Sequence, residues 1–303
     1  MINLMFNTLL LITFIGILLY TIFYNKKYIW KLTLLTALSF VLVNFLPWTF
    51  SAVSLVMIAL PLIFYKKLTY STLMTTSMLG SILCAFFLLN YYLNNDSSLI
   101  VLLGILSVVF ICFLAIFGIM KDNIIKFLLI SNLIQLTFVF LDLSVAKLTL
   151  KISTLGVIQI FNYTLAGMLL FVTLGSLIQE NKHKYLSELQ GYYYKDPHVS
   201  IFASIAAISL AGLPGLNIFV SEWLLFKTSF NVNPIITVWG IFAALLLFIM
   251  YFKIIYILLS GRKALKEKAH MSLQIYNWVI ALACLVFGLL PFTQLYLLGL
   301  LFI

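Results

Sequence analysis

Charge is the scarcest property of this 303-residue sequence: 9% of its residues are charged, 64% are hydrophobic, and the mean hydropathy is +1.17. A soluble domain cannot be built from this composition, because too few polar residues are present to cover its surface. The sequence also lacks strands of about ten residues in which polar and apolar residues alternate, which argues against a membrane β-barrel. The composition therefore predicts an all-α polytopic membrane protein.

Apolar runs of about 20 residues recur along the chain, each long enough to cross about 30 Å of hydrocarbon as a helix. They predict about ten transmembrane helices, at residues 3–23, 31–49, 50–65, 69–93, 98–119, 124–143, 152–178, 200–228, 235–258 and 272–302. The first run is too long for a signal peptide and lacks a basic n-region, so we expect a retained helix. The longest loop is 179–199, so no second domain is expected outside the membrane.

Motifs of soluble enzymes are missing: the sequence has no GxGxxG, Walker loop, HExxH or GxSxG. Cys84, Cys112 and Cys284 lie singly inside apolar runs, which favours small buried side chains over metal or disulfide roles. The histidines all lie in loops, so no haem ligand pair is expected. We expect no cofactor in this chain, and we expect any chemistry to be ion movement.

Basic residues are distributed unevenly. One set of alternate loops holds nearly all of the loop lysines and Arg262, whereas the other holds little beyond Lys147 and Lys151. Because basic loops mark the inner side, both termini are expected outside. The net charge of +10 reflects this topology, with some attraction to anionic headgroups, and no nucleic-acid partner is expected.

Arginine is nearly absent, since Arg262 is the one arginine among 18 basic residues. Phe (27) and Tyr (16) outnumber Gly (14) and Pro (6), which AT-rich coding produces. This bias, together with the hydrophobicity, indicates an organelle-encoded protein of the mitochondrial inner membrane. An AT-rich bacterium is the alternative source.

Two features interrupt the apolar run 200–228. Pro214 and Gly215 are expected to break the helix near mid-membrane, where a broken helix is tolerated only beside protein or a water-filled cavity. Glu222 follows about 12 Å further along the helix. A carboxylate there costs a few kcal/mol, so it should face a hydrated cavity, pair with a Lys, or stay protonated. We therefore predict a proton-relay role for Glu222; the alternative is snorkelling to the interface or pairing with Lys227.

Other ionisable residues in apolar runs are fewer. Lys253 is a second relay candidate, with snorkelling as an equal alternative. Lys126 lies one turn into its helix on the inner side, where anchoring is favoured over a relay. Asp142 is expected to be solvated at the outer interface. Uncharged polar residues near mid-depth are explained by helix–helix hydrogen bonding, with hydration of a proton path as the alternative: Asn132, Gln135, Gln159, Asn162, Tyr163 and Thr164.

Three motifs resemble the antiporter-like membrane subunits of respiratory complex I, in matching order and spacing from about residue 98 to the end. SLAGLPGLNIFVSEWLLF (209–226) is similar to the family's broken-helix motif S-L-x-G-x-P-P/G-x-x-x-F-x-x-K/E. KDNIIKFLLISNLIQLTFVFLDL (121–143) resembles its K-R/K-x-L-A-Y-S-S-I helix, with Lys126 in register. LLLFIMYFKIIYILL (245–259) resembles its L-Y-x-Y-L-R-L-I-Y helix, with Lys253 on the basic position.

Within this family, the sequence most resembles NADH dehydrogenase subunit 2, because Gly167 stands where subunits 4 and 5 place a central Lys or His. Glu222 argues the other way, since subunit 2 more often has Lys there and subunit 4 has Glu. Subunit 4 is therefore the nearest alternative.

The N-terminal part departs from the family. Residues 1–97 align only loosely and are expected to form a reduced first repeat, followed by an antiporter-like second half at 98–303. Ser54 stands where the family has its membrane Glu, and the M-K-x-G-x-x-P-F-H-x-W signature is missing. The implied ion path is reduced to Glu222 and Lys253, with water near Asn162 and Tyr163.

The resemblance implies a membrane-arm subunit of complex I that contributes to proton translocation, while NADH oxidation occurs in other subunits that hold FMN and Fe–S clusters. The implied partners are other membrane-arm subunits, a separate chain that supplies the missing half-channel, and lipids such as cardiolipin. The alternatives are a stand-alone cation/proton antiporter, which should carry more membrane carboxylates, and a structural membrane subunit that no longer pumps.

Overall fold

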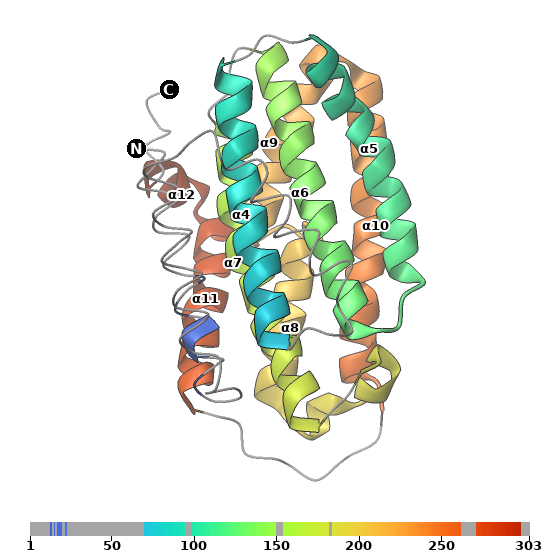
Figure 1. The fold of residues 1–303 in the computed structure, drawn as a ribbon, viewed down its shortest axis with the longest axis vertical. Helices are drawn as coiled ribbons and strands as arrows, with labels where there is room; N and C mark the ends of the chain where they lie inside the picture. The colour runs from blue at the N-terminus through green and yellow to red at the C-terminus, as the bar shows by residue number, and fades with distance from the viewer. Residues whose placement is uncertain are drawn as a thin grey trace.

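The computed structural model describes residues 70–94, 98–149, 154–181, 184–261 and 271–297, together with isolated positions between 13 and 22. All regular elements among these residues are helices, arranged as an elongated bundle (Figure 1). Five of the described helices are long and apolar enough to cross a membrane. The predicted all-α polytopic membrane fold is therefore confirmed.

The helices follow one another with short connections. In chain order they are α4 (Tyr70–Asn94), α5 (Ser98–Ile119), α6 (Ile124–Leu148), α7 (Thr154–Asn181), the 3₁₀ turns η2 (Leu186–Leu189) and η3 (Tyr192–Tyr194), α8 (Pro197–Leu210), α9 (Asn217–Val232), α10 (Pro234–Leu259), α11 (Met271–Leu289) and α12 (Pro291–Leu297).

Most of the predicted segments correspond to these helices. The segments 31–49 and 50–65, and nearly all of 3–23, lie outside the described residues, and the predicted division at residue 97 therefore stays a prediction. The segment 200–228 is interrupted, as predicted, and forms α8 and α9. The single helix predicted at 272–302 is wrong, because α11 ends at Leu289 and the short α12 starts at Pro291.

Side-chain caps explain where several helices begin. Asn123 Oδ1 accepts a hydrogen bond from the backbone N–H of Lys126 at 3.0 Å, at the start of α6. Asp196 caps α8 in the same way, and Asn233 caps α10, each followed directly by a proline at the first helical position. Asn and Asp satisfy free N–H groups at a helix start, and proline there has no N–H to lose.

The central helix is α7, which is buried along its whole apolar span from Leu155 to Ile178. It packs against α4, α6, α8, α9 and α11. Its polar residues Gln159, Asn162 and Tyr163 are therefore enclosed by other helices. An uncharged polar side chain in such a place needs a hydrogen-bond partner from a neighbouring helix.

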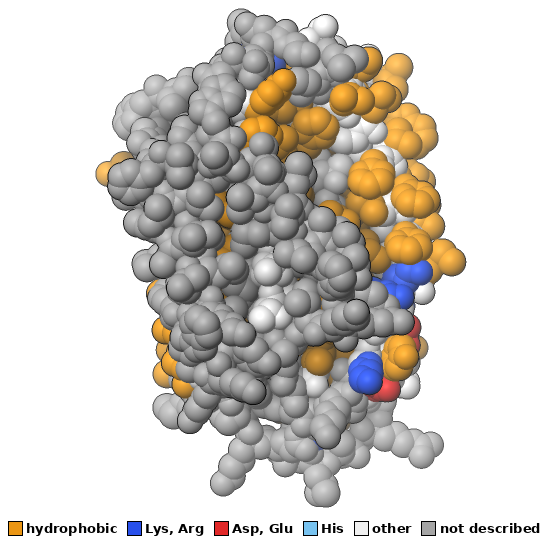
Figure 2. All heavy atoms as spheres, in the orientation of Figure 1, with side chains coloured by type: hydrophobic (Ala, Val, Ile, Leu, Met, Phe, Trp, Pro, Cys, Tyr) orange, Lys and Arg blue, Asp and Glu red, His pale blue; other side chains and the backbone are white. Residues whose placement is uncertain are grey.

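The outer faces of α5 and α10 are apolar. Figure 2 shows hydrophobic side chains over α5, with lysine and acidic side chains below them on the same face. The large exposed side chains of α5 include Leu102, Leu106, Phe110, Phe113 and Phe117. Such a surface is stable against lipid or another membrane subunit and not against water.

Candidate functional site

The interruption of the 197–232 helix is made by a glycine cap at Gly212. The backbone of Gly212 has a φ of 69°, in the left-handed region. Its N–H donates to Ser209 O at 3.0 Å, and the N–H of Leu213 donates to Ile208 O at 3.4 Å. These two bonds form a Schellman motif, which ends a helix and satisfies its last carbonyl groups.

Pro214 lies beyond this cap and not at the end of the helix. It is exposed in the connection between α8 and α9, which also contains Gly215 with a φ of 93°. The prediction that Pro214 and Gly215 mark a discontinuous helix is confirmed, but the helix already ends at Leu210 because of Gly212. With 14 residues in α8 and 16 in α9, the two halves are about 21 Å and about 24 Å long. The break therefore divides the helix near its middle.

Helix α11 supports the break from outside. A Cβ added at Gly288 of α11 would lie 2.3 Å from Leu216 Cα and 2.4 Å from Gly215 O. The backbones of α11 and of the break are therefore in direct contact. A side chain at residue 288 would push them apart.

The Glu222 side chain folds back against the break. A Cβ added at Gly212 would lie 2.0 Å from Glu222 Oε2. Glu222 is 4% exposed, and its Oε1 is buried without a hydrogen-bond partner in the described part of the chain. Lys227 is exposed, and no ion pair joins it to Glu222. Neither snorkelling nor pairing with Lys227 accounts for this geometry.

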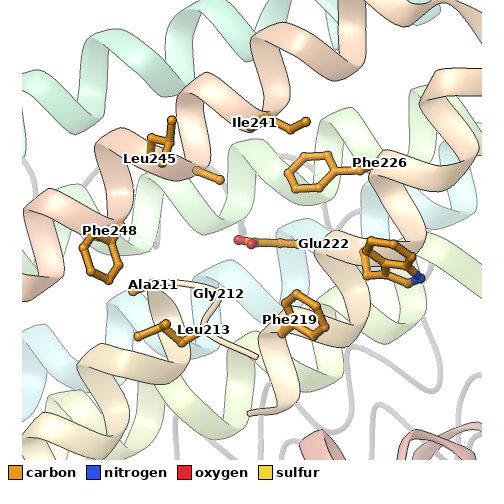
Figure 3. Close-up of a pocket in the computed structure, with 11 residues that line it drawn as sticks. Ala211, Gly212, Leu213, Phe219, Glu222, Phe226, Ile241, Leu245 and Phe248 are labelled. Carbon is orange, nitrogen blue, oxygen red and sulfur yellow. The ribbon is translucent and has the colours of Figure 1, made fainter. Parts of the chain in front are cut away.

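A cavity of about 200 Å³ lies beside the carboxylate. Figure 3 shows the Glu222 carboxylate pointing from α9 into the space between Gly212 and Phe248 of α10. The outer wall includes Trp223 and Leu245, both 58% exposed, so the cavity lies toward the outer face of α9 and α10. The other lining residues are Ala211, Leu213, Phe219, Phe226, Ile241 and Ala244.

A hydrogen-bonded cluster ties both sides of the break to α7. Asn217 Nδ2 donates to Asn162 O at 2.9 Å, and Ser209 Oγ donates to Asn217 Oδ1 at 2.5 Å. Asn162 Nδ2 donates to Ser221 Oγ at 3.4 Å, while Asn162 Oδ1 is buried without a partner in the described residues. Asn217 was not singled out from the sequence. Its position three residues after Pro214 is the signal that could have identified it.

Two other predicted residues of α7 lie against α4 and α6. Gln159 Nε2 donates to Gln135 Oε1 of α6 at 3.0 Å. Tyr163 donates to Met78 Sδ of α4 at 3.6 Å, and its ring lies so close to Gly167 that an added Cβ would be 2.8 Å from it. The tyrosine ring therefore occupies the space in which a side chain at 167 would begin.

Both lysine candidates lie toward the ends of helices. Lys253 Nζ donates to Ile119 O at 3.1 Å and to Lys121 O at 2.8 Å, at the C-terminal end of α5. A cation there complements the partial negative charge of the last carbonyl groups. Lys126 is half-buried in the first turn of α6. The structure thus gives Lys253 a helix-capping contact and brings Glu222, and not Lys253, to the break.

The prediction that Asp142 is solvated is wrong. This aspartate was expected to be solvated at the outer end of a helix ending at residue 143, but α6 continues to Leu148 and Asp142 is 1% exposed. Both of its carboxylate oxygens are buried without a hydrogen-bond partner in the described residues. Asp142 and Glu222 thus lie buried on two helices, α6 and α9, that pack together. The described part of the chain contains no group of three or more His, Cys, Asp or Glu side chains that could hold a metal ion.

Comparison with known proteins identifies relatives. Residues 68–248 match the family described as NADH:quinone oxidoreductase/Mrp antiporter, TM. Subunit M of F(420)H(2) dehydrogenase from Methanosarcina mazei is 25% identical over 150 residues, 50% of this chain and 30% of that protein. Subunit M of NADH-quinone oxidoreductase from Buchnera aphidicola is 24% identical over 151 residues, 50% of this chain and 29% of that protein.

A solved structure shows the same fold. A chain in the Mrp complex from Dietzia sp. DQ12-45-1b superposes with a TM-score of 0.71 at 15% identity, covering 99% of this chain and 65% of that chain. At this identity the likeness concerns the fold alone. The sequence matches cover less than a third of the length of both curated relatives.

Proposed function

Because the chain belongs to the NADH:quinone oxidoreductase/Mrp antiporter transmembrane family, we propose that it is a membrane-arm subunit of a complex I-type enzyme and takes part in proton translocation. The observation that carries this proposal is the Glu222 carboxylate folded against the break between α8 and α9. In this proposal the chain carries no redox centre. NADH oxidation and quinone reduction occur in partner subunits that hold FMN and Fe–S clusters.

The break gives Glu222 an electrostatic environment that a continuous helix cannot give. The last carbonyl groups of α8 surround Gly212, and a helix C-terminus carries partial negative charge. A carboxylate placed there, away from bulk water and from any basic partner in the described residues, is destabilised relative to the neutral acid. Glu222 is therefore suited to hold a proton and to release it when its surroundings change.

A change in the surroundings can come through the break itself. The connection 211–216 lies between two helices that are each fixed to α7 by the Ser209–Asn217–Asn162 cluster. A small movement of α9 relative to α8 would move the Glu222 carboxylate relative to the end of α8. Charge and conformational changes in a neighbouring subunit would thereby be coupled to proton release, which is the step we propose for this chain.

The finer assignment to subunit 2 of a mitochondrial NADH:ubiquinone oxidoreductase rests on the sequence. Gly167 leaves no central charge on α7, and the Tyr163 ring fills that space. Both curated relatives named above are M subunits, so they support the family rather than this choice. We further propose that the chain is organelle-encoded, contacts other membrane-arm subunits and cardiolipin, and works with a separate chain that supplies the missing N-terminal half-channel.

Cation/proton antiport is the second candidate, since the fold also matches a chain of an Mrp complex. The two functions differ in what drives the proton. In a complex I-type enzyme, proton movement depends on NADH oxidation, whereas an antiporter needs only a cation gradient. Native electrophoresis of digitonin-solubilised membranes separates them: we expect the chain to comigrate with NADH dehydrogenase activity, and migration as a small free species would contradict the proposal.

The mechanism is tested with Glu222→Gln in the intact complex, reconstituted in vesicles. Glutamine keeps the size and polarity of the side chain but cannot release a proton. We expect fewer protons translocated per electron, with the complex assembled to the wild-type level. An unchanged proton-to-electron ratio in an assembled Glu222→Gln complex would assign Glu222 to structure and refute the proton-relay role.

A further inference from the structure

A second carboxyl group lies in the same apolar interior and has no role in the proposal above. Asp142 of α6 is 1% exposed, and both of its oxygens lack a hydrogen-bond partner in the described residues. A buried aspartate that stabilises a fold accepts hydrogen bonds or pairs with a cation, because otherwise its burial costs several kcal/mol. Asp142 does neither with any residue that the structure describes, so a structural role within this part of the chain does not account for it.

The described side chains around Asp142 offer no positive charge to balance it. Helices α4, α5, α7 and α9 pack against α6, and α10 contacts it through the hydrogen bond between Tyr251 and Ser131. The basic side chains described on these helices are the exposed Lys227 of α9 and Lys253 of α10, whose Nζ donates to carbonyl groups at the C-terminal end of α5. On α6 itself, Lys147 Nζ donates to Tyr92 O of α4 at 3.1 Å, and Lys126 lies at the other end of the helix. The other ionisable side chains described on these helices are Tyr70, Cys84, Tyr91 and Tyr92 of α4, Cys112 of α5, Tyr163 of α7, Glu222 of α9, and Tyr251 and Tyr256 of α10.

Glu222 is the other buried carboxyl group described on the helices that pack against α6, since it is 4% exposed on α9. The Glu222 Oε1 atom is also buried without a partner in the described residues. Two neighbouring carboxylates in a medium of low dielectric constant repel each other, so a state in which both are charged is strongly disfavoured. The two carboxyl groups therefore hold at least one proton between them, and either Asp142 or Glu222 can carry it.

The two carboxyl groups lie at different depths. Asp142 is 18 residues along α6 from Ile124, about 27 Å from that end and about 9 Å from Leu148. Glu222 lies close to the break, about 15 Å from Val232 at the end of α9. The connection between α6 and α7 belongs to the lysine-poor side, which the charge distribution places outside. Asp142 is thus on the outer side of Glu222.

We propose that Asp142 is a second proton carrier, which accepts the proton of Glu222 and passes it toward the outer side of the membrane. This inference rests on the proposed function. In the transfer, the O–H bond of the Glu222 carboxylic acid breaks and an O–H bond forms on the Asp142 carboxylate. Glu222 becomes the carboxylate, Asp142 becomes the acid, and no electron changes place.

The polar contacts beyond Asp142 continue in the same direction. Ser144 lies two residues further along α6, and its Oγ is hydrogen-bonded to Tyr92 OH at 2.5 Å. Tyr92 is at the end of α4 that lies beside the C-terminal end of α6. The hydroxyl groups thus stand between Asp142 and the outer surface, where a released proton leaves.

The test uses the whole complex reconstituted in vesicles, with Glu222→Gln, Asp142→Asn, the double variant, and Asp142→Glu. If both groups carry the same proton in sequence, Asp142→Asn lowers the proton-to-electron ratio as far as Glu222→Gln does. The double variant then falls no further than either single variant, because sites that act as one unit are not additive. Asp142→Glu, which keeps the carboxyl group, restores at least part of the lost translocation.

Thr173→Ala is the matched control, since Thr173 is a buried polar residue of α7 that bonds only within its own helix, to Leu169 O at 2.7 Å and Leu170 O at 3.1 Å, and its replacement removes no acid. We expect a wild-type proton-to-electron ratio in this variant. Difference infrared spectroscopy of the complex before and after energisation supplies an independent readout. A carboxyl C=O band should be present in the wild type, shift in Asp142→Glu and be lost in Asp142→Asn.

The outcomes separate this inference from the proposed function. If Glu222→Gln lowers the ratio and Asp142→Asn does not, the second carrier is refuted and the function of Glu222 stands. If neither changes it, the proposed function itself fails. If Asp142→Asn does not assemble, the absence of a band shift in Asp142→Glu refutes the inference. If the infrared carboxylate band changes with the sodium concentration, the two carboxyl groups bind a cation, and the proton-carrier role of Asp142 is refuted.

Discussion

Lys253 of α10 and Glu222 of α9 are both ionisable side chains within apolar helices, but the structure gives them different partners. Lys253 donates two hydrogen bonds to backbone carbonyls at the C-terminal end of α5, where the helix dipole favours a cation. Glu222 lies against the end of α8, with one oxygen unpartnered in the described residues and a cavity beside it. The fold thus gives the Lys253 ammonium group hydrogen-bond acceptors, whereas it buries the Glu222 carboxylate without a donor for its Oε1 in the described residues.

This difference predicts that changes near Glu222 alter coupling, while changes at Lys253 alter stability. The largest effect is expected for Gly212→Val. Valine would be forced into the left-handed region at a cost of about 1–3 kcal/mol. Its Cβ would also occupy the place of the Glu222 carboxylate. We expect loss of both assembled complex and proton translocation, measured by native electrophoresis and by proton uptake in vesicles.

Gly215→Val is the matched variant for Gly212→Val. Gly215 also has a positive φ, but a Cβ there would meet nothing closer than Leu289 Cδ2 at 3.8 Å. Backbone strain is therefore shared by the two variants, and displacement of Glu222 is confined to Gly212. Equal loss of translocation in both would show that strain in the break, and not the carboxylate position, controls coupling.

A moderate effect is expected for Lys253→Met. Methionine removes the cation that caps the last carbonyl groups of α5, which we expect to lower stability by about 1–2 kcal/mol because the site is only partly buried. Thermal inactivation of the complex should occur at a lower temperature. The proton-to-electron ratio of the surviving complex should equal that of the wild type.

Lys227→Met provides the control for Lys253→Met. Lys227 lies on α9 with Glu222, but it is exposed and forms no ion pair with it. Its replacement should change stability by no more than about 0.5 kcal/mol. Loss of translocation in Lys227→Met would mean that this lysine supplies the charge that Glu222 needs, and the contrast with Lys253 would no longer hold.

The smallest effect is expected for Pro214→Ala. Pro214 is exposed, and α8 is already terminated by the Gly212 cap before the chain reaches it. The substitution mainly gives the unfolded chain more freedom, which costs about 0.4–1 kcal/mol. Coupled turnover should remain close to the wild-type rate. A large loss would show that the proline, and not the glycine, maintains the break.

The sequence was sufficient to predict the membrane helices and the existence of a break, because both depend on local composition. Runs of apolar residues gave the helix ranges, and Pro214 with Gly215 marked the interrupted segment. The residue that ends α8 is Gly212, and its signal in the sequence is a glycine followed closely by a proline, a known C-cap pattern. A proline inside a helix disrupts it more strongly than a glycine does. Pro214 does not have this effect, because it lies beyond the end of α8.

The roles of Asp142 and Lys253 could not be predicted, because they depend on helix ends and on tertiary contacts. A helix ending at residue 143 would leave Asp142 at the surface, whereas five further residues bury it. Nothing in the local sequence shows that Lys253 reaches the carbonyl groups of residues more than 130 positions away. The proton-relay role of Glu222 stays a prediction, as does the water path near Asn162. For Lys253, the Lys253→Met variant decides between the relay role and the capping of α5 that the contacts favour.

The contact at Gly288 joins α11 to the break between α8 and α9. Two backbones that touch have no side chain between them to absorb a displacement, so α11 and residues 215–216 must shift together. A force that tilts α11 is therefore delivered to the start of α9, one and a half turns before Glu222. The Met271 end of α11 lies about 26 Å from Gly288, so α11 carries a displacement at that end to the break.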